Sequence, residues 1–305
     1  MTKVFIDGSA GTTGLRIRER LAERGDIEQI ILTDELRKDA GARRDALRSA
    51  DIAFLCLPDA AAKESVSFAE GSDTVIIDTS TAHRTADGWA YGFAELSAAH
   101  RESIAESRRI ANPGCHASGF IASVYPLVES GIVPRDARLT AYSLTGYSGG
   151  GKGLIAEYED ECRDERHGSC RIYATSLCHK HLPEMKAVCG LDDAPLFSPI
   201  IGDYYAGMAT TVMLADTDAA RVHEALAAHY ESSRLVSVAP LGGDESVIYA
   251  SNMAGRDTMR LWVCGHEKQC TVTAVFDNLG KGASGAAIQN MNISMGVDET
   301  TGLVL

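Results

Sequence analysis

Long apolar runs are missing from this sequence. No stretch approaches the ~20 consecutive apolar residues that a membrane-spanning helix requires. The first residues also lack the charged region, the apolar region and the cleavage site of a secretory signal peptide, because Met1 to Gly8 pass directly into a short strand-like segment. We therefore expect a cytoplasmic protein with no membrane partner.

An excess of positive charge is also missing. The 29 lysine and arginine residues are outnumbered by 42 aspartate and glutamate residues, which gives a formal net charge of -13 at pH 7. Nucleic acids and anionic membranes favour basic surfaces, so neither is an expected partner. A small anionic substrate remains compatible with this balance because it needs only a local positive site.

None of the eight cysteines belongs to a Cys-x-x-Cys pair. This absence excludes the spacing of zinc ribbons, iron–sulfur proteins and thioredoxin-like redox proteins. Free cysteine usually behaves as a small buried hydrophobe, and Cys56, within an apolar strand-like segment, fits that description. We expect most of the eight to be of this kind.

At 305 residues the chain is longer than one hydrophobic core usually fills, which predicts two domains. Near the N-terminus, strands expected at residues 4–6 and 27–32 flank a helix expected at residues 15–24. A strand–helix–strand pattern of this kind predicts an α/β Rossmann-type dinucleotide-binding domain built on a parallel sheet.

After about residue 135 the strand-like runs become longer and the helices fewer. This change predicts an α+β substrate and dimerisation domain with a mixed or antiparallel sheet. Its main strands are expected at residues 138–144, 209–214, 247–252 and 271–275. The predicted parts of the chain are residues 1–115, residues 116–280, and residues 281–305, a C-terminal helix that returns to the first domain.

Glycine stands at every third position between the first strand and the first helix. Such a turn lets a pyrophosphate approach the backbone N–H groups at a helix N-terminus, where the helix dipole favours negative charge. A plain turn that needs glycine for its conformation is the alternative. The residues expected to bind the dinucleotide here are Gly8, Ser9, Gly11, Thr12, Thr13 and Gly14.

The residues expected to determine the choice between NAD and NADP give conflicting indications. Asp34, about 20 residues beyond the glycine turn, suits a ribose 2′-hydroxyl and favours NAD. Arg37 and Lys38 follow it directly, and they suit a 2′-phosphate and favour NADP. The residues alone leave both cofactors open.

Cys115 differs from the other cysteines in its position. It follows Asn112-Pro113-Gly114 and stands at the predicted start of a helix. A helix N-terminus lowers the pKa of a thiol and makes the nucleophilic thiolate more available. We therefore predict Cys115 as a covalent nucleophile, with Asn112 beside the substrate.

The segment His-Lys-His-Leu-Pro-Glu supplies the expected acid or base. An imidazole titrates near neutral pH, and we favour His181 over His179 for this role. Glu184 adds a carboxylate that orients a ring, and it is a candidate substrate-binding residue. A metal site with Cys178 or Cys189 is the alternative, but the spacing matches no tetrahedral site.

Other segments supply binding candidates. Ser80 and Arg84 follow a strand end, where open α/β sheets bind ligands, so Ser80 is expected at the cofactor and Arg84 at the substrate. Ser148 lies in a segment rich in glycine that suits an anionic substrate but is not a P-loop. Asn278 and Lys281 precede a helix of small residues and are expected near the nicotinamide. The alternative for Arg84 is a surface ion pair, and the alternative for the segment of Ser148 is a flexible connector. Simple packing is the alternative for the segment of Asn278 and Lys281.

Four segments in fixed order make the chain resemble the N-acetyl-gamma-glutamyl-phosphate reductase family, in its shorter length class. They are Gly-Ser-Ala-Gly-Thr-Thr-Gly at residues 8–14, Asn-Pro-Gly-Cys at 112–115, His-Lys-His-Leu-Pro-Glu at 179–184 and Asp-Asn-Leu-Gly-Lys-Gly-Ala at 277–283. The resemblance extends over essentially the whole chain, and the combination is far more specific than any one motif.

The resemblance implies NADP as the cofactor, with Arg37 near its 2′-phosphate, and a place in arginine biosynthesis. It implies that Cys115 forms a thioester with an acyl phosphate, releases phosphate, and yields N-acetylglutamate 5-semialdehyde after hydride transfer. Arg84 would match the substrate-binding arginine of the family, and His179 and His181 its histidine motif. A homodimer or homotetramer is expected, because Rossmann dehydrogenases commonly associate through the sheet of the second domain.

Two other functions stay open at this point. An enzyme like aspartate-semialdehyde dehydrogenase would use the same mechanism on a different acyl phosphate. A non-catalytic NADP-binding sensor would keep the glycine turn, but it would need neither Cys115 nor the two histidines.

Overall fold

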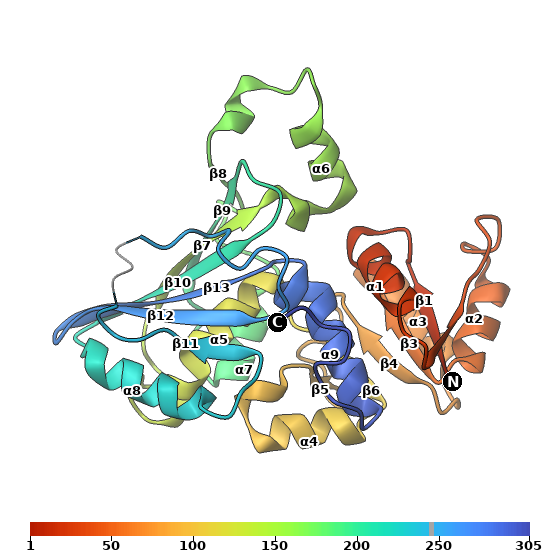
Figure 1. Cartoon of the computed structure of the whole chain (residues 1–305), viewed down its shortest axis with the longest axis horizontal. Helices are drawn as coiled ribbons and strands as arrows, with labels where there is room; N and C mark the ends of the chain where they lie inside the picture. Colours follow the sequence, from red (N-terminus) through yellow and green to blue (C-terminus); the bar gives the residue numbers. More distant parts are fainter. Residues whose placement is uncertain (244–246) are drawn as a thin grey trace. The chain divides into compact units, whose positions relative to one another are not determined.

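The computed structural model describes residues 1–243 and 247–305, and the chain divides into two compact units (Figure 1). Unit 1 consists of Met1–Gly114 and Ala283–Leu303. Unit 2 consists of Cys115–Gly282 and Val304–Leu305. The chain therefore passes from one unit to the other immediately before Cys115.

Unit 1 is built on a six-stranded sheet in which every pair of neighbouring strands is parallel. The strand order β2-β1-β3-β4-β6-β5 places the N-terminal strand inside the sheet. The strands are β1 (Thr2–Asp7), β2 (Ile27–Ile30), β3 (Ile52–Leu55), β4 (Val75–Asp78), β5 (Ala90–Tyr91) and β6 (Arg109–Ala111). The predicted Rossmann-type α/β architecture is confirmed.

Both faces of this sheet are covered by helices, which explains why its strands read as continuous apolar runs. Successive side chains point to opposite faces, so Val4 and Ile6 enter one core and Phe5 the other. The first core is closed by α1 (Thr12–Ala22), α4 (Ala98–Glu106) and α9 (Gly285–Ser294). The second core is closed by α2 (Ala40–Ser49) and α3 (Asp59–Phe68), and η1 (Ala94–Leu96) is a short 3-10 turn.

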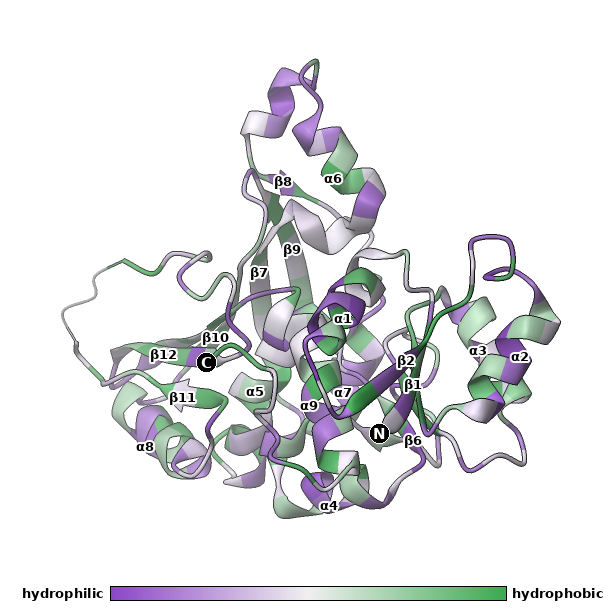
Figure 2. Ribbon diagram, turned by 45° about the vertical axis from the view of Figure 1, so that its right-hand side comes forward, coloured by the Kyte–Doolittle hydropathy of each residue, from purple (hydrophilic) through white to green (hydrophobic). Residues whose placement is uncertain are grey.

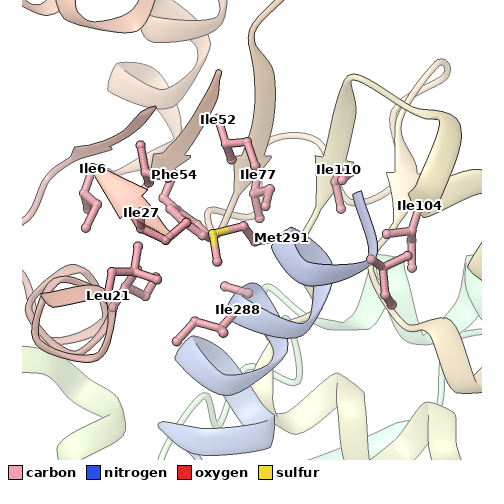
Figure 3. Packing of buried hydrophobic residues seen from close by; sticks show 14 of the residues in the cluster. Ile6, Leu21, Ile27, Ile52, Phe54, Ile77, Ile104, Ile110, Ile288 and Met291 are labelled. Atoms are coloured by element: carbon pink, nitrogen blue, oxygen red, sulfur yellow. The ribbon is translucent and has the colours of Figure 1, made fainter. Parts of the chain in front are cut away.

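The last helix of the chain, α9, completes the first core. Ile288 and Met291 lie beside Phe54 and Ile77 of the strands (Figure 3). The helix follows a π-helical turn at Gly280–Ser284, and every residue from Gly285 to Ile293 is buried. Residues 283–303 therefore belong to unit 1, although they lie at the far end of the sequence.

Unit 2 is built on a seven-stranded sheet with the order β11-β12-β13-β10-β7-β9-β8. The pairs β7–β9 and β11–β12 are parallel and the other pairs are antiparallel. Its strands are β7 (Thr140–Gly146), β8 (Arg171–Ile172), β9 (Leu196–Gly202), β10 (Met208–Ala215), β11 (Val236–Val238), β12 (Met259–His266) and β13 (Gln269–Phe276). The predicted mixed sheet is confirmed.

Helix α5 (Cys115–Glu129) packs on one face of this sheet. A Cβ added at Gly119 would lie 2.7 Å from Cβ of Thr210, so only glycine permits this close approach of helix and strand. The other helical segments of unit 2 are η2 (Tyr147–Gly150), α6 (Gly151–Glu159), η3 (Glu165–Gly168), α7 (Leu182–Cys189) and α8 (Ala219–Tyr230). Hydrophilic and hydrophobic residues alternate along α8, as expected of a helix with one buried face (Figure 2). No helix in the described part of the chain is long and apolar enough to span a membrane.

The strand expected at residues 247–252 is wrong, because these residues form a loop and a turn. Their composition, Val-Ile-Tyr-Ala followed by Ser-Asn, is typical of a strand. In the fold, however, Ile248 and Ala250 are partly buried against the core cluster that contains Trp262, and β12 occupies the place beside β13. Val247 and Tyr249 are exposed, so the strand-like composition indicated neither the pairing nor the burial of the whole segment.

Candidate active site

The glycine turn between β1 and α1 needs glycine at two positions for steric reasons. Gly8 has φ +87°, and a Cβ added there would lie 2.3 Å from the carbonyl oxygen of Cys56. A Cβ at Gly14 would lie 2.5 Å from the Gly8 carbonyl oxygen. The Gly11 amide donates to that same oxygen at 3.0 Å and closes the turn. The backbone segments therefore pack closely in this turn, and the glycines place no side chain over them.

The start of α1 is suited to an anion. Gly11 occupies the N-cap position, so no side chain caps the first N–H groups of the helix. The buried Thr12 Oγ1 has no hydrogen-bond partner among the described residues. An orphaned hydroxyl beside uncapped helix amides fits a phosphate oxygen, which the positive end of the helix dipole favours. The residues present thus fit the pyrophosphate of a dinucleotide.

A cavity of about 470 Å³ opens beside this turn. Gly8 and Ser9 line it, together with the carboxylate residue Asp7 and four cationic residues, Arg18, Arg37, Lys38 and Arg43. Arg37 Nη1 also lies 3.5 Å from a carboxylate oxygen of Asp34, but both side chains are largely exposed, so this pair holds neither in place. The cavity is therefore locally positive on a protein of strongly negative net charge.

A buried ion pair, which the sequence did not indicate, lies in the wall of this cavity. Arg43 of α2 donates to both carboxylate oxygens of Asp7 at 3.1–3.2 Å. It also donates to Ser65 Oγ at 2.6 Å and to a Glu64 carboxylate oxygen at 2.8 Å. Through these hydrogen bonds Arg43 links α2 and α3 to the end of β1, where the glycine turn begins. No spacing in the sequence connects these residues.

The carboxyl end of β4 carries a second polar cluster. The buried Asp78 accepts from the Ser80 amide at 2.9 Å and from Ser80 Oγ at 2.7 Å. Nδ1 of His83 lies 2.6 Å from the same carboxylate, and the His83 ring stacks on Trp89 with the centroids 4.1 Å apart. Ser80, a predicted cofactor residue, is thus held by Asp78, while His83 was not singled out from the sequence.

Arg84 and Asn112 lie at the same sheet edge and are bonded to each other. Arg84 Nε donates to the Asn112 carbonyl oxygen at 3.0 Å, and Nη2 donates to the Thr79 carbonyl oxygen at 3.0 Å. The buried Asn112 carboxamide donates to the Ala283 carbonyl oxygen and accepts from Asn290 Nδ2, each at 3.1 Å. These contacts fix the backbone that leads to Cys115, and they favour a positioning role for Asn112.

Cys115 begins α5 and is only partly buried. Gly282 lies against it, since a Cβ added at Gly282 would lie 3.1 Å from the Cys115 Cβ. Burial raises the pKa of the Cys56 thiol to about 12, and burial raises that of Cys270 to about 11. Those two thiols stay protonated at neutral pH, whereas Cys115 lies at a helix N-terminus, where a thiolate is favoured.

The two predicted histidines lie together in a group of aromatic rings that also contains His116. The ring centroids of His179 and His181 are 4.7 Å apart, and those of His116 lie 5.3 Å and 5.7 Å from them. The His181 amide donates to Nδ1 of His179 at 3.2 Å. All three histidines are buried, and Phe197 packs against His116 and His179. The structure thus brings both predicted histidines to the residue that follows Cys115.

The Pro-Glu that follows His181 begins α7, with the buried Glu184 in its first turn. Helix α7 packs against α5, which brings the histidine segment to the start of α5. Among residues 1–243 and 247–305, no group of three or more His, Cys, Asp or Glu side chains is arranged to hold a metal ion.

Ser148 and Asn278, predicted for the substrate and the cofactor, are hydrogen-bonded to each other. Asn278 Nδ2 donates to Ser148 Oγ at 3.0 Å, and Asn278 Oδ1 accepts from the Gly207 amide at 2.9 Å. Lys281 lies three residues further on and is buried. Asn278 therefore ties the glycine-rich turn of η2 to the segment that contacts Cys115.

Asp277, which the sequence did not single out, holds this segment in shape. Its buried carboxylate accepts from the amides of Leu279 and Gly280 at 2.7 and 3.0 Å and from that of Gly255 at 2.6 Å. The Gly282 amide in turn donates to the Asp277 carbonyl oxygen at 2.9 Å. The loop beside Cys115 is rigid for this reason.

Two family models match the chain. The model described as "Semialdehyde dehydrogenase, NAD binding domain" matches residues 32–106, and the one described as "Semialdehyde dehydrogenase, dimerisation domain" matches residues 115–278. The aspartate semialdehyde dehydrogenase II of Vibrio cholerae complexed with ASA has a similar fold, with a TM-score of 0.75 at 16% identity over 97% of this chain and 98% of that chain. The Candida albicans enzyme solved with NADP has a TM-score of 0.68 at 14% identity, over 96% and 98%. The class is thus that of the semialdehyde dehydrogenases.

Sequence relatives narrow the class. Proteins of Brucella anthropi and Brucella ovis are 48% identical to this chain over 306 aligned residues, which cover 96% of this chain and 98% and 99% of theirs. Both are named N-acetyl-gamma-glutamyl-phosphate reductase. This chain belongs to the N-acetyl-gamma-glutamyl-phosphate reductase family.

Proposed function

We propose that this protein reduces N-acetyl-gamma-glutamyl phosphate to N-acetylglutamate 5-semialdehyde and phosphate with NADPH, as a step of arginine biosynthesis. The observation that carries the proposal is the placement of Cys115 at the start of α5, beside a buried histidine group, in a chain 48% identical to reductases of that name. A non-catalytic sensor has no use for this arrangement.

The dinucleotide is assigned to the glycine turn and the cavity beside it. Gly8, Ser9, Gly11, Thr12, Thr13 and Gly14 would hold the pyrophosphate, with Ser80 at the end of β4, which is separated from β1 by β3 in the same sheet. We assign the 2′-phosphate of NADP to Arg37, with Arg18 and Lys38 beside it, because these cations line that cavity and the fourth, Arg43, is already paired with Asp7. Asn278 and Lys281 are assigned to the nicotinamide side. The nicotinamide, when bound, supplies the hydride for the reduction.

Cys115 performs the covalent chemistry in this proposal. Its thiolate attacks the acyl carbon, a C–S bond forms, and the bond from that carbon to the phosphate oxygen breaks with its electron pair leaving on phosphate. The product on the enzyme is a thioester, and the phosphate takes one proton from solvent. Backbone N–H groups at the start of α5 stabilise the oxyanion, an interaction worth roughly 3 kcal/mol per donor.

The histidine pair is assigned to proton transfer. One imidazole, which we assign to His181 with His179 as its neighbour, accepts the thiol proton before the attack. The same imidazolium returns that proton to the carbonyl oxygen when the thioester is reduced. The resulting thiohemiacetal breaks its C–S bond, so that the aldehyde leaves and the Cys115 thiol is restored. Glu184, buried in the first turn of α7, is assigned to substrate orientation.

Arg84 and Ser148 complete the proposed substrate site. Arg84 already donates to two backbone carbonyl oxygens, which fixes its guanidinium at the strand edge. We assign its role to an anionic group of the substrate, because a guanidinium held in place binds carboxylate or phosphate with little further loss of freedom. Asn112 acts through the backbone that precedes Cys115.

The decisive experiment follows NADPH formation from N-acetylglutamate 5-semialdehyde, NADP and phosphate, with aspartate semialdehyde in a parallel assay. We expect turnover of the acetylated aldehyde, and a loss by a factor of at least about 10³ in Cys115→Ser. Cys162→Ser, which changes an exposed thiol, is the matched control. Turnover of aspartate semialdehyde alone assigns the related dehydrogenase activity, and turnover of neither aldehyde overturns the proposal.

We also propose a homodimer or homotetramer formed through the face of the unit 2 sheet opposite α5. On that face Met213 pairs with Thr140, and Thr140 pairs with Leu196, so three neighbouring strands present one row. Met213 is 44% exposed and Leu196 is 57% exposed. Large apolar side chains exposed in one row are typical of a surface that another subunit covers.

A further inference from the structure

His116, the residue after the proposed nucleophile, belongs to a continuous chain of hydrogen bonds. Thr210 Oγ1 lies 2.8 Å from Ser143 Oγ, and Ser143 Oγ lies 2.8 Å from Nδ1 of His116. Nε2 of His116 lies 2.7 Å from the hydroxyl of Tyr173. The chain thus runs from the buried sheet, through α5, to a tyrosine in the loop after β8.

We propose that His116 is a positioning residue that directs the hydroxyl proton of Tyr173 toward Cys115, so that Tyr173 stabilises negative charge on that sulfur. The proposal deepens the proposed function, on which it rests through the assignment of Cys115 as the nucleophile. It concerns residues of unit 2 only.

The first step of the argument is that His116 is neutral. Its ring is buried against Phe197 and two further histidines, and this burial lowers the pKa of His116 to about 3. A neutral imidazole has one nitrogen that donates and one that accepts. The hydrogen bonds on its two sides are therefore coupled: fixing the direction of one fixes the other.

The second step is the choice between the two directions. If Ser143 donates to Nδ1, then Nε2–H donates to the Tyr173 oxygen, and the proton of the tyrosine is turned outward. In the opposite arrangement Tyr173 donates to Nε2 and turns only lone pairs outward. The two arrangements hold the same number of protons. Conversion of one into the other breaks an N–H bond at one ring nitrogen, forms an N–H bond at the other, and reorients the hydroxyl groups.

The third step is that negative charge on Cys115 selects the first arrangement. The Tyr173 hydroxyl is bonded to His116, the residue that directly follows Cys115. Burial and the charge of Cys115 both raise the pKa of Tyr173, so Tyr173 keeps its proton. A thiolate repels outward lone pairs and attracts an outward O–H group. Aligned dipoles along the chain strengthen that donor, since each hydrogen bond polarises the next.

Packing holds Tyr173 in the position that this role needs. Its ring meets the ring of His179 edge to face, with the centroids 5.7 Å apart, and its amide donates to the Pro199 carbonyl oxygen of β9. The tyrosine is therefore fixed between the histidine group and the sheet. Its position adds a hydroxyl donor to the Cys115 site that neither the glycine turn nor the histidine pair supplies.

The test measures the reactivity of Cys115 itself and needs no substrate. The proteins are alkylated with iodoacetamide across a range of pH, and modification at Cys115 is read from its peptide, with the exposed Cys162 of the same chain as an internal reference. We expect Tyr173→Phe to raise the midpoint of Cys115 alkylation by about one pH unit, which is about a tenfold change in the ionisation constant. The Cys162 rate should not change.

Two replacements of His116 separate positioning from folding. In His116→Gln the amide nitrogen takes the place of Nε2 and keeps a donor for Tyr173. In His116→Asn the amide is too short to reach Tyr173, although it still reaches Ser143. We expect the glutamine variant to retain a midpoint near that of the natural protein and the asparagine variant to shift as Tyr173→Phe does.

Tyr142→Phe is the matched control, because Tyr142 lies next to Ser143 on β7 but its side chain points to the opposite face. An unchanged midpoint in a folded Tyr173→Phe protein overturns the proposal, whatever the histidine variants do. Turnover of the acetylated aldehyde is assayed separately. If Tyr173→Phe shifts the midpoint of Cys115 alkylation but the acetylated aldehyde is not turned over, only the proposed function is refuted. If the aldehyde is turned over but the midpoint does not shift, only the proposed role of His116 and Tyr173 is refuted.

Discussion

Gly282 lies against Cys115 with no room for a side chain. A Cβ added at Gly282 would lie 3.1 Å from the Cys115 Cβ, 3.1 Å from the Asp277 carbonyl oxygen and 3.1 Å from a ring carbon of Phe276. The Asp277 carboxylate fixes this loop through three amides, so the loop cannot yield. Cys115 is one of the neighbours that would have to give by a few tenths of an ångström.

Gly282→Ala is therefore expected to lower kcat by about tenfold, because displacement of the Cys115 sulfur, the proposed nucleophile, by a few tenths of an ångström already impairs its alignment. Steady-state kinetics in the reductase assay measure this effect. Gly153→Ala in α6 is the control, since nothing lies within 4 Å of an added Cβ there. A Gly282→Ala enzyme with the natural kcat would contradict the close packing that we describe.

The neutral state of His116 makes the fold sensitive to acid. The pKa of His116 is about 3 in the folded protein against an ordinary value of 6.5, so below pH 6.5 the unfolded chain binds a proton that the folded chain does not. Stability from this group is therefore present above pH 6.5 and is lost as the pH falls toward 3. At pH 5 the loss amounts to about 2 kcal/mol.

Urea unfolding at pH 7 and pH 5 checks this expectation. His116→Gln cannot titrate, so its free energy of unfolding should fall by about 2 kcal/mol less between the two pH values than that of the natural protein. Equal falls in the two proteins would show that His116 does not remain neutral in the folded state.

The cations of the cavity beside the glycine turn predict the choice of cofactor. Replacing Arg37 and Lys38 together by alanine should raise the Kd for NADP at least about tenfold and leave the Kd for NAD nearly unchanged, because only NADP carries the 2′-phosphate. Isothermal titration with each cofactor measures both constants. Arg48→Ala, on the outside of α2, is the control. Equal losses for both cofactors would place these cations elsewhere on the nucleotide.

The exposed apolar row on the unit 2 sheet predicts the response of the oligomer to charge. Met213→Asp combined with Leu196→Asp should convert the oligomer to monomer, because two carboxylates would be buried without partners at the interface. Light scattering after size-exclusion chromatography gives the mass. Leu36→Asp changes a side chain in unit 1 that is comparably exposed, and it should leave the mass unchanged. An unaltered mass in the double variant would move the interface to another surface.

Much of the fold could be predicted from the sequence because its signals are local. The glycine turn, the apolar strands of unit 1 and the helix that begins at Cys115 each depend on residues close together in the chain. The strand expected at residues 247–252 was wrong for the complementary reason. Ile248 and Ala250 are only partly buried, against the core cluster that contains Trp262, while Val247 and Tyr249 are exposed, and the segment is a loop rather than part of a ladder of strands.

The contacts that arrange the candidate site were not predictable in this way. Asp7 meets Arg43 across 36 residues, and Ser143 meets Thr210 across 67. Asp78 and His83 are close in the chain, but only the end of β4 and the stacking on Trp89 bring them together. Single polar residues at such separations carry no periodic signal.

The sequence by itself therefore determined the chemical groups: a cysteine at a helix start, two histidines two residues apart, and a turn open to phosphate. Only the tertiary structure decided which groups are buried and which contact one another. It buried His116, which keeps its ring neutral, and it set Gly282 against Cys115. Burial and long-range contacts arise when the sheets and helices pack, and for that reason short sequence motifs do not encode them.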